Sequence, residues 1–314
     1  MAAFVGLGMA GVVRSGRRVC VCSAETEPDS GPGWIRRANP YSGKPVYAET
    51  VEWSVPEMEE TPRNTLERIV WWKSDEVDIK RESLPFLALR NRVMGLEKDQ
   101  GKANGSLVLE KLKRKPESKI NRVAEIRYKW PDEEAPSPEV DSMRIAASAE
   151  SNGDVAVAIQ TDSKYFAGEL QHMNRVRAAS ELPIICTEVI NQQYQFYELR
   201  YHRADAAVVL AAVYAKEDMD YNLKIAKVLG MALFIEVHSV EELDYALSFK
   251  GLKAILAGPR DLNSMRSSFA DSQKLVSERI DELRSRNILV LAEGQEDEIQ
   301  ADSGLIDAVI VYRD

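Results

Sequence analysis

The sequence predicts a (β/α)8 barrel, an α/β TIM-barrel fold in which parallel strands close into a cylinder and helices cover its outside. Short, continuous apolar runs recur along the chain, as a parallel sheet buried on both faces requires. Amphipathic segments of helix length separate these runs, and eight strand units are the number that closes such a barrel. The eight runs occupy residues 122–126, 154–160, 183–187, 204–213, 232–237, 254–258, 288–293 and 307–312.

The first unit has the pattern that the later units repeat. The run 122–126 carries a carboxylate, Glu125, near its end, and a polar loop with three prolines follows it. An apolar-periodic segment, 140–147, comes next, so the order is strand, loop and helix. In this fold the chemistry lies at the C-terminal ends of the strands, which confines the search for a site to eight short places.

The last unit lacks its helix. The run 307–312 is followed by Arg313 and Asp314 alone, so the sequence predicts a barrel with the eighth helix missing. The apolar outer face of the eighth strand is then expected to be bare, and exposed apolar patches commonly mark interaction surfaces. We therefore expect the segment 25–58 or a partner protein to cover this strand.

Composition is that of an ordinary globular protein. Of 314 residues, 45% are hydrophobic and 29% are charged, as in one domain of about 200 to 250 residues with extensions. No run reaches the roughly 20 apolar residues of a membrane span. The formal charge of −9 argues against a nucleic-acid partner, because binding to phosphate backbones depends on a basic surface.

The first 24 residues have the composition of an organelle transit peptide. They contain Arg14, Arg17 and Arg18 and no acidic residue, and the composition changes abruptly at Glu25. The segment ends in VCVCSA, which resembles a plastid processing site and predicts the chloroplast stroma, with the mitochondrion as the alternative. Cleavage there removes three arginines and takes the formal charge from −9 to −12.

The chain divides into four segments by these patterns. Each is defined by its composition and periodicity. They are the transit peptide, 1–24, a flexible arm rich in proline, glycine and acids, 25–58, an N-terminal helical extension, 59–120, and the barrel, 121–314.

The helical extension is expected to contain two helices. Thr61 suits the cap of the first helix, Pro62 suits its first turn, and apolar residues follow at helical spacing together with Lys73. A second helix is expected from Asn104 to Arg114. Such extensions usually plug the bottom of a barrel or cover its mouth.

The positions of the cysteines and histidines limit which disulfide, metal or catalytic sites the chain can form. Without the transit peptide, Cys186 is the remaining cysteine, and it lies on an apolar run, which excludes a disulfide framework or a cysteine-rich metal site. His172, His202 and His238 fall on different units, so no metal site and no cofactor is predicted. His238 follows a strand end, where it is either a loop residue or a base that faces the mouth.

Four stretches carry a resemblance to a known family. They are TPRNTLERIVWWK from Thr61, TDSKYFAG from Thr161, VLGMALFIEVH from Val228 and, more weakly, GPRDL from Gly258. On these stretches the chain, from about Pro40 to its C-terminus, resembles plant indole-3-glycerol-phosphate synthase. The resemblance implies a (β/α)8 barrel and a reaction that closes and decarboxylates an anthranilate-derived ribulose phosphate to make the indole ring.

The resemblance also implies site residues that this chain retains. Glu125, Glu236 and Glu293 stand at the carboxylate positions of the family, and Arg260 at its arginine. Phe166 and Arg260 are the candidate substrate-binding residues, although Phe166 either lines a ligand pocket or packs the mouth. Carboxylates in a barrel mouth need partners. These three therefore either keep a catalytic role or persist as a structural network with the arginines of the mouth.

Other family positions are substituted. Arg127 stands where the family has a lysine, Gly258 where it has an asparagine, and Thr187 where it has the lysine that serves as general acid. A threonine hydroxyl cannot protonate a leaving hydroxyl as an ammonium does, and losing a general acid typically costs about 10²- to 10⁴-fold in rate. Two family serines are also replaced, by Trp130 and Gly294.

The eighth strand bears on phosphate binding. The family has a glycine turn there, which opens a helix whose N-terminal amides hold the substrate phosphate. This chain reads Val311-Tyr312-Arg313-Asp314 at that place. A sugar-phosphate ligand is thus implied by the resemblance, whereas its phosphate-binding turn is not found in the sequence.

Two functions from different classes follow. The substitutions favour a catalytically degenerate chloroplast protein that serves as a structural, regulatory or assembly partner of an unidentified protein. The alternative is an active or altered indole-3-glycerol-phosphate synthase, a carboxy-lyase of tryptophan biosynthesis. Binding of a substrate or product analogue, and rescue of a tryptophan auxotroph, discriminate between them.

Overall fold

The computed structural model describes residues 35, 61–115, 118–137 and 140–312. The chain splits into two compact units, and all described residues belong to the second, Gly31–Asp314. The predicted transit peptide and, except for Ile35, the predicted arm lie outside the described residues.

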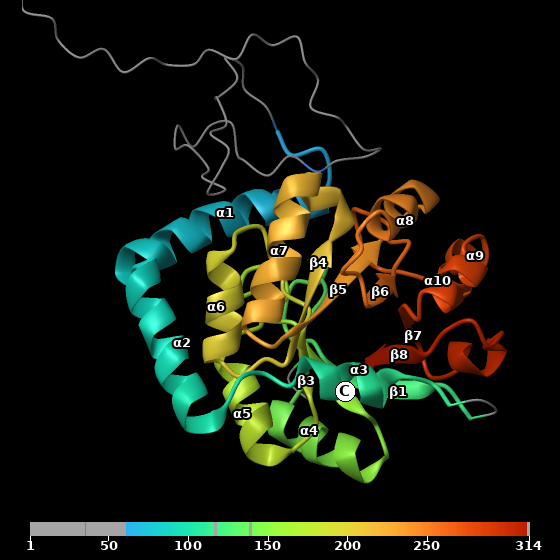
Figure 1. The fold of residues 1–314 in the computed structure, drawn as a ribbon, viewed down its shortest axis with the longest axis horizontal. Coiled ribbons are helices and arrows are strands. Elements are labelled where there is room, and N and C mark those ends of the chain that lie inside the picture. Colours follow the sequence, from blue (N-terminus) through green and yellow to red (C-terminus); the bar gives the residue numbers. More distant parts are fainter. Residues whose placement is uncertain (1–34, 36–60, 116–117, 138–139, 313–314) are drawn as a thin grey trace, which may run out of the picture. The chain divides into compact units, whose positions relative to one another are not determined.

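A closed barrel of eight parallel strands forms the centre of this unit, which confirms the predicted fold (Figure 1). Each strand pairs with the next in the sequence, and the last pairs with the first, for example through Val123 and Ile310. The strands are β1 Asn121–Ile126, β2 Ala156–Ile159, β3 Ile184–Cys186, β4 Ala206–Leu210, β5 Ala232–Val237, β6 Ala254–Ala257, β7 Leu289–Gly294 and β8 Ala308–Tyr312.

Helices in the connections surround the barrel (Figure 1). Within the described ranges, no helix is both long and apolar enough to span a membrane. The described residues end at Tyr312 and include no helix after β8. In chain order the helices are α4 Ser142–Ser151, α5 Gln171–Ala179, α6 Tyr194–Tyr201, the 3-10 helix η1 Ala211–Val213, α7 Lys216–Val228, α8 Val240–Leu247, α9 Phe269–Ser277, α10 Ile280–Ser285 and the 3-10 helix η2 Glu298–Ala301.

The barrel interior is a packed core. Small side chains such as Ala158, Ala206 and Ala254 lie beside large ones such as Phe234 and Leu256 in one apolar cluster. All five are at most 1% exposed. This mixture of sizes fills a barrel of eight strands and leaves no central pore.

In the part of the chain that the structure describes, three helices precede the barrel, α1 Thr65–Ser83, α2 Phe86–Gln100 and α3 Gly105–Leu112. The prediction of a helix after Asn104 is confirmed. The side chain of Asn104 caps α3 by accepting a hydrogen bond from the N–H of Leu107.

The helix α2 was not among the predicted helices. This helix buries two apolar side chains, Leu89 and Val93, so it lacks the wide apolar stripe that marks a core-facing helix. Pro85 separates it from α1, and Leu84 before the proline has an extended backbone, as residues in that position prefer. What looked like one helix followed by a loop is therefore a pair of helices with a break.

The start of α1 also differs from the prediction. Asn64, and not Thr61, caps the helix, and its side chain accepts a hydrogen bond from the N–H of Glu67 at 2.8 Å. The Glu67 carboxylate in turn accepts one from the backbone N–H of Arg63 at 2.6 Å. Such reciprocal bonds between side chains and backbone fix the first turn of a helix.

The extension closes both ends of the barrel. Val108 of α3 belongs to the interior cluster, at the N-terminal ends of the strands. A β-carbon on Gly105 would lie 2.1 Å from the backbone nitrogen of Ala232 in β5, so the start of α3 must be a glycine. At the opposite end, the N–H of Leu66 in α1 donates to the carbonyl of Leu262 after β6. Thus α3 plugs the bottom, and α1 lies against the mouth.

The outer face of β8 is covered, which corrects the prediction of a bare strand. Val309 and Val311 belong to the outer apolar cluster and are 0% and 2% exposed, whereas Ile310 points into the barrel. The outer cluster also includes Ile306 and, at its edge, Ile299 of η2. The connection between β7 and β8 therefore contributes the cover, and the partner surface expected beside β8 loses its basis.

Candidate functional site at the mouth of the barrel

The structure gathers all eight predicted site residues at the C-terminal ends of the strands. Six of them line one cavity of about 30 Å³, and the other two lie beside it. They are Glu125 in β1, Arg127 after β1, Phe166 after β2, Thr187 after β3, Glu236 in β5, Gly258 and Arg260 after β6, and Glu293 in β7.

Arg260 bridges two carboxylates in this group. Its Nε donates to Oε1 of Glu236, while Nη1 and Nη2 donate to Oε2 and Oε1 of Glu293 at 3.0 and 2.7 Å. The contact with Glu293 is the bidentate arrangement that a planar guanidinium suits. Both glutamates are buried. One arginine thus holds two buried charges together across the mouth.

His238 adds a second positive charge beside Glu236. Its Nε2 lies 3.1 Å from Oε1 of Glu236, and its Nδ1 lies 3.0 Å from Oε2 of Glu242. Burial lowers the pKa of His238, but the bonds to the two glutamates outweigh it and raise the pKa to about 9. Burial likewise raises the pKa of Glu236, but the charge of Arg260 and the bond from His238 bring it down to about 2. His238 is therefore a paired imidazolium at neutral pH, not a free base.

Arg127 ties Glu125 to the wall of the mouth. Its Nε donates to Oε1 of Glu125 at 3.0 Å, and its Nη2 lies 3.7 Å from Oε1 of Glu293. The guanidinium also stacks on Trp130, with 3.6 Å between Cζ and the ring centroid. Burial raises the pKa of Glu125, Arg127 offsets part of that rise, and Glu293 adds to it. The glutamates and arginines of the mouth thus form a network of ion pairs, and whether the three glutamates also have a catalytic role stays a prediction.

Thr187 faces the cavity with a hydroxyl that has no hydrogen-bond partner among the described residues. Its backbone carbonyl accepts a hydrogen bond from Nε2 of Gln160 at 2.8 Å, so the backbone is fixed while the side chain is not. Among the described residues that line this cavity there are two arginines and no lysine. Among the described residues, the lining of this cavity therefore offers a hydroxyl and paired guanidinium groups, but no ammonium.

One buried cation near the mouth was not recognised as a site residue. Lys73 of α1 has a 1% exposed side chain, and its Nζ lies 2.5 Å from Glu76, 2.8 Å from Asp162 and 3.2 Å from Glu188. Burial lowers the pKa of Lys73, but the three carboxylates together raise it above its ordinary value. The signal was visible in the sequence, because this lysine lies on the apolar face of a helix.

A second pocket, of about 220 Å³, adjoins the first over the ends of β1, β7 and β8. Trp130 and Arg266 line it, and the hydroxyl of Ser267 donates to Oε2 of Glu293 at 3.0 Å. Each of the two spaces is smaller than the about 300 to 1,000 Å³ of an ordinary small-molecule site. The described residues contain no group of three His, Cys, Asp or Glu that could hold a metal ion.

Two glycines of the mouth have their space filled by neighbours. A β-carbon on Gly258 would lie 3.3 Å from Oε1 of Glu236 and 3.7 Å from Nε of Arg260. One on Gly294 would lie 3.1 Å from Cβ of Phe269. The distances to Glu236 and Phe269 are tight, whereas the distance to Arg260 is an ordinary contact that leaves no room for a side chain longer than a β-carbon.

Comparison with known proteins agrees with this architecture. A family model described as indole-3-glycerol phosphate synthase matches residues 66–300. The chain belongs to the indole-3-glycerol phosphate synthase family. It is 33% identical over 267 residues to the "Indole-3-glycerol phosphate synthase" of Rippkaea orientalis and to that of Microcystis aeruginosa. The matches cover 82% of this chain and 85% and 84% of those proteins. It is 31% identical over 259 residues to the protein of the same name from Acaryochloris marina.

Membership of the synthase family bears on the two functions that the sequence left open. The matched proteins carry the name of the enzyme, so the comparisons support the catalytic alternative better than the degenerate one. Catalytic degeneracy stays a prediction, and it rests on Arg127, Thr187 and Gly258 of this chain.

Proposed function

We propose that this member of the indole-3-glycerol phosphate synthase family does not form indole and acts as a structural or regulatory partner of another protein. The observation that carries the proposal is Thr187, which lines the mouth cavity where the family pattern has its acid lysine. A hydroxyl holds its proton far above neutral pH, and the loss of a general acid costs about 10²- to 10⁴-fold in rate. No described lysine lines this cavity to replace it.

The other cations near the mouth are poor substitutes for that acid. Lys73 does not line the cavity, and Asp162 and Glu188 hold its ammonium behind the cavity wall. The ring nitrogens of His238 are both engaged by glutamates. Arginine keeps its proton at physiological pH, so neither Arg127 nor Arg260 acts as a general acid.

The space at the mouth also supports the proposal. The cavity of about 30 Å³ has room for one water molecule, and the adjoining pocket of about 220 Å³ is also smaller than the about 300 Å³ or more of a small-molecule site. To admit such a ligand, the bridge from Arg260 to Glu236 and Glu293 would have to open. Such an opening would take the cation away from two buried carboxylates, which is unfavourable.

The second candidate function is indole-3-glycerol phosphate synthase activity. The names of the relatives support it, and so does the retention of Glu125, Glu236, Glu293 and Arg260 at the strand ends. On this alternative, the ion pairs of the mouth open when substrate binds, and a group other than a lysine at position 187 supplies the proton.

Turnover by the purified full chain separates the two candidates. The substrate of the family is supplied, the Microcystis aeruginosa relative serves as positive control, and rescue of a tryptophan auxotroph is scored in parallel. We expect no measurable indole formation, and none from Thr187→Lys alone, because Arg127 and Gly258 remain. Turnover within about tenfold of the ordinary enzyme median of about 10 per second would establish the synthase instead.

The partner and the compartment complete the proposal. We propose a chloroplast location from residues 1–24, with a fluorescent fusion of this segment as the test and a mitochondrial signal as the contrary outcome. Affinity purification of the tagged full chain from plastids is expected to recover a reproducible protein partner. The Thr187→Lys variant and an untagged chain are purified in parallel for comparison. Recovery of the chain alone would remove the support for a scaffold role.

A further inference from the structure

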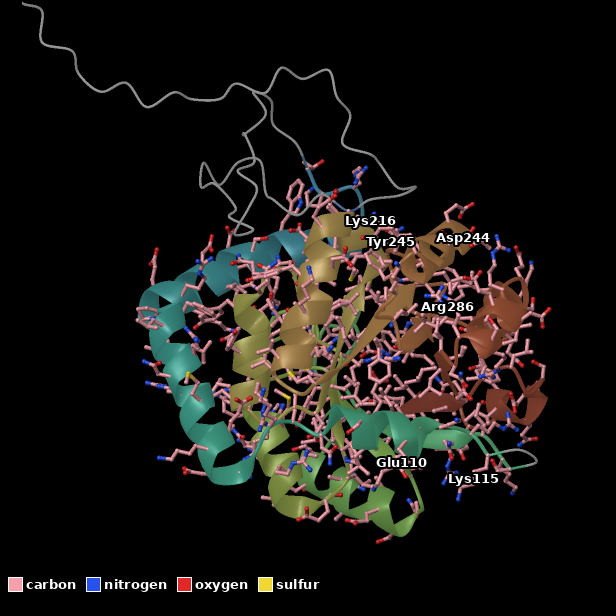
Figure 2. The ribbon with its side chains drawn as sticks, viewed as in Figure 1. Glu110, Lys115, Lys216, Asp244, Tyr245 and Arg286 are labelled. Carbon is pink, nitrogen blue, oxygen red and sulfur yellow. The ribbon has the colours of Figure 1, made fainter. Side chains whose placement is uncertain are left out.

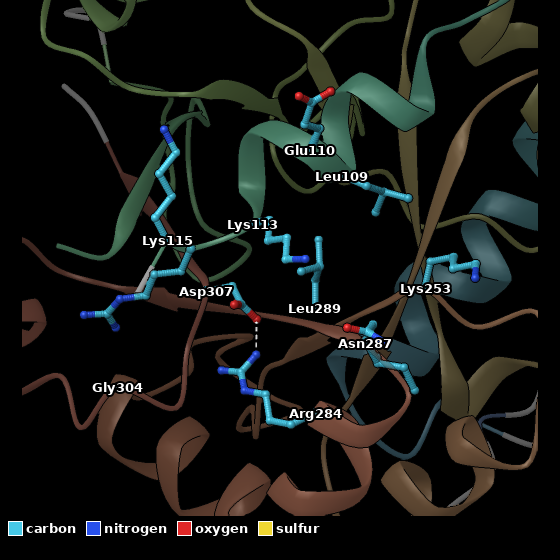
Figure 3. A pocket seen from close by; sticks show the side chains of 12 residues that line it. Leu109, Glu110, Lys113, Lys115, Lys253, Arg284, Asn287, Leu289, Gly304 and Asp307 are labelled. Carbon is cyan, nitrogen blue, oxygen red and sulfur yellow. Dashed lines mark hydrogen bonds and ion pairs between the residues drawn. The ribbon is translucent and has the colours of Figure 1, made fainter. Parts of the chain in front are cut away.

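A cavity of about 690 Å³ opens at the bottom of the barrel, at the end opposite to the mouth (Figure 3). It lies between α3 and the N-terminal ends of β6, β7 and β8, and it is called the basal pocket below. Its volume is that of an ordinary small-molecule site. Figure 2 places Glu110 and Lys115, which line it, at the other end of the molecule from Lys216, the first residue of α7.

The basal pocket is distinct from the candidate active site. None of its lining residues lines either space at the mouth. Its floor is apolar, with Leu109 of α3 and the buried Ile288 and Leu289 at the start of β7. The function proposed for the mouth makes no use of these residues.

Positive charge surrounds this floor. Five cations and two carboxylates line the basal pocket, which leaves a surplus of three positive charges in a chain whose formal charge is −9. Ordinary solvation of a surface does not require several cations to converge on one hollow of an acidic protein. The charged lining residues are Glu110, Lys113, Arg114, Lys115, Lys253, Arg284 and Asp307.

The two arginines are neutralised by neighbouring carboxylates. Arg284 donates to Asp307 at 2.6 Å, which Figure 3 marks with a dashed line, and Arg114 donates to Asp302 at 2.5 Å. With Asp302 counted, the surplus of the basal pocket is two positive charges, from three lysines and Glu110.

The three lysines of the basal pocket are unpaired. The side chains of Lys113, Lys115 and Lys253 form no hydrogen bond or ion pair with any residue that the structure describes. They come from different walls, two from the segment after α3 and one from the turn before β6 (Figure 3). Three lysines without an ion-pair partner among the described residues thus line one cavity from two sides.

A purely structural role explains part of this pattern. Lys113 is the C-cap residue of α3, where a cation stabilises the negative end of the helix dipole. That reason does not extend to Lys253, which precedes a strand. The placement of Lys253 on a different wall of the same pocket from Lys113 and Lys115 is what a bound anion would use.

We propose that the basal pocket binds a compact organic polyanion, a small molecule with two or more phosphate or carboxylate groups. Its anionic groups contact Lys113, Lys115 and Lys253, and its carbon skeleton rests on Leu109 and Leu289. Lysine suits this role because its ammonium is a mobile point charge that meets phosphate or carboxylate without fixed geometry. The proposal goes beyond the function of the mouth and does not depend on it.

Isothermal titration calorimetry on the full chain tests this site. The probes are fructose 1,6-bisphosphate for phosphate esters, citrate for polycarboxylates, and hexaglutamate for an acidic peptide, each against sodium sulfate at matched ionic strength. We expect one of the two small anions to bind with one-to-one stoichiometry, tighter than about 1 mM, and to weaken as salt is raised. The better probe tells which anionic group the site takes.

Variants locate the binding. Lys253→Glu and, separately, Lys113→Glu should weaken it by at least about tenfold, because each removes a charge-assisted contact. The matched control is Lys250→Glu, an exposed lysine outside the pocket, which should leave the affinity within about twofold. All three lysines are exposed, and thermal unfolding of each variant confirms that it is folded.

Several results would overturn the proposal. One such result is that Lys250→Glu and Lys253→Glu weaken anion binding equally. Others are that hexaglutamate binds and neither small anion does, or that no probe binds. Thr187→Lys at the mouth should leave the affinity of the basal pocket for the anion unchanged. Failure of this proposal is therefore separate from failure of the proposed function.

Discussion

The guanidinium of Arg260 lies over Gly258, with Nε 3.7 Å and Nη2 3.8 Å from the point that a β-carbon on Gly258 would occupy. From there Arg260 reaches both Glu236 and Glu293. The ion-pair bridge across the mouth thus depends on the glycine, because the guanidinium of Arg260 lies where a longer side chain at position 258 would extend.

Gly258→Asn should disrupt this bridge. Its β-carbon would be 3.3 Å from Oε1 of Glu236, and the amide would have to displace Arg260. We expect a loss of about 1 to 3 kcal/mol in the free energy of unfolding, as for other overpacked sites, measured by urea titration. Gly251→Asn is the control, since its nearest neighbour is a side-chain atom at 3.9 Å. Equal stability of the two variants would mean that Arg260 moves without cost.

The stability of the protein should fall on both sides of neutral pH. The pKa of His238 rises from 6.5 to about 9 on folding, so its contribution is full below pH 6.5 and is lost as the pH rises through about 9. The pKa of Glu236 falls from 4.5 to about 2, so its contribution is present above pH 4.5 and is lost as the pH falls toward 2. Each amounts to on the order of 3 kcal/mol.

Urea titrations between pH 6 and 10 check the alkaline side. His238→Gln should abolish the decline in unfolding free energy that the wild type has between about pH 6.5 and 9. His202→Gln is the control, because burial lowers the pKa of His202 and its contribution is lost on the acid side. A decline that persists in His238→Gln would assign the alkaline effect to another group.

Lys73→Met should be among the most destabilising single changes at the mouth. It leaves Asp162 and Glu188 buried without their cation, and removal of one partner from a buried ion pair costs about 3 to 5 kcal/mol. The control is Lys80→Met on the same helix, where a partly exposed lysine pairs with Glu76 and the expected cost is below about 1 kcal/mol. Similar losses for the two variants would show that the Lys73 network is solvated.

Gly294→Ser tests the contact with Phe269. The added side chain would press on the buried ring, at a cost of about 1 to 3 kcal/mol. Phe269→Leu alone should also destabilise, but the double variant should lose less than the sum of the two, and the difference is measured in a double-mutant cycle. Strict additivity would mean that the two positions do not compete for space.

Much of the fold could be predicted because each strand of a parallel barrel has a local sequence pattern, a short run of apolar residues. The runs 122–126, 232–237 and 288–293 are largely apolar and carry a carboxylate, Glu125, Glu236 or Glu293, at their last or next-to-last residue. Since every strand of such a barrel runs the same way, these carboxylates had to meet at one end. Their convergence needed no knowledge of tertiary contacts.

The pairing within the site could not be predicted. Lys73 meets Asp162 and Glu188 only after a helix outside the barrel has docked on the ends of β2 and β3. The cover of β8 is a similar case, because Ile299 and its neighbours precede the strand in loops without apolar periodicity. Local patterns specify elements, whereas these contacts depend on distances between elements far apart in the chain.

The plug formed by α3 has a consequence for the order of assembly. This helix is synthesised before any strand, yet its first residue, Gly105, donates a hydrogen bond to the carbonyl of Gly230, just before β5. A growing chain therefore carries the apolar face of α3, with Val108 and Leu112, uncovered until half of the barrel has been made. Contacts of such long sequence separation form late, since a large loop must close before they contribute. Assembly of the barrel is therefore complete only when α3, which is synthesised before the strands, packs against their N-terminal ends. Addition of the last strand, β8, is not sufficient.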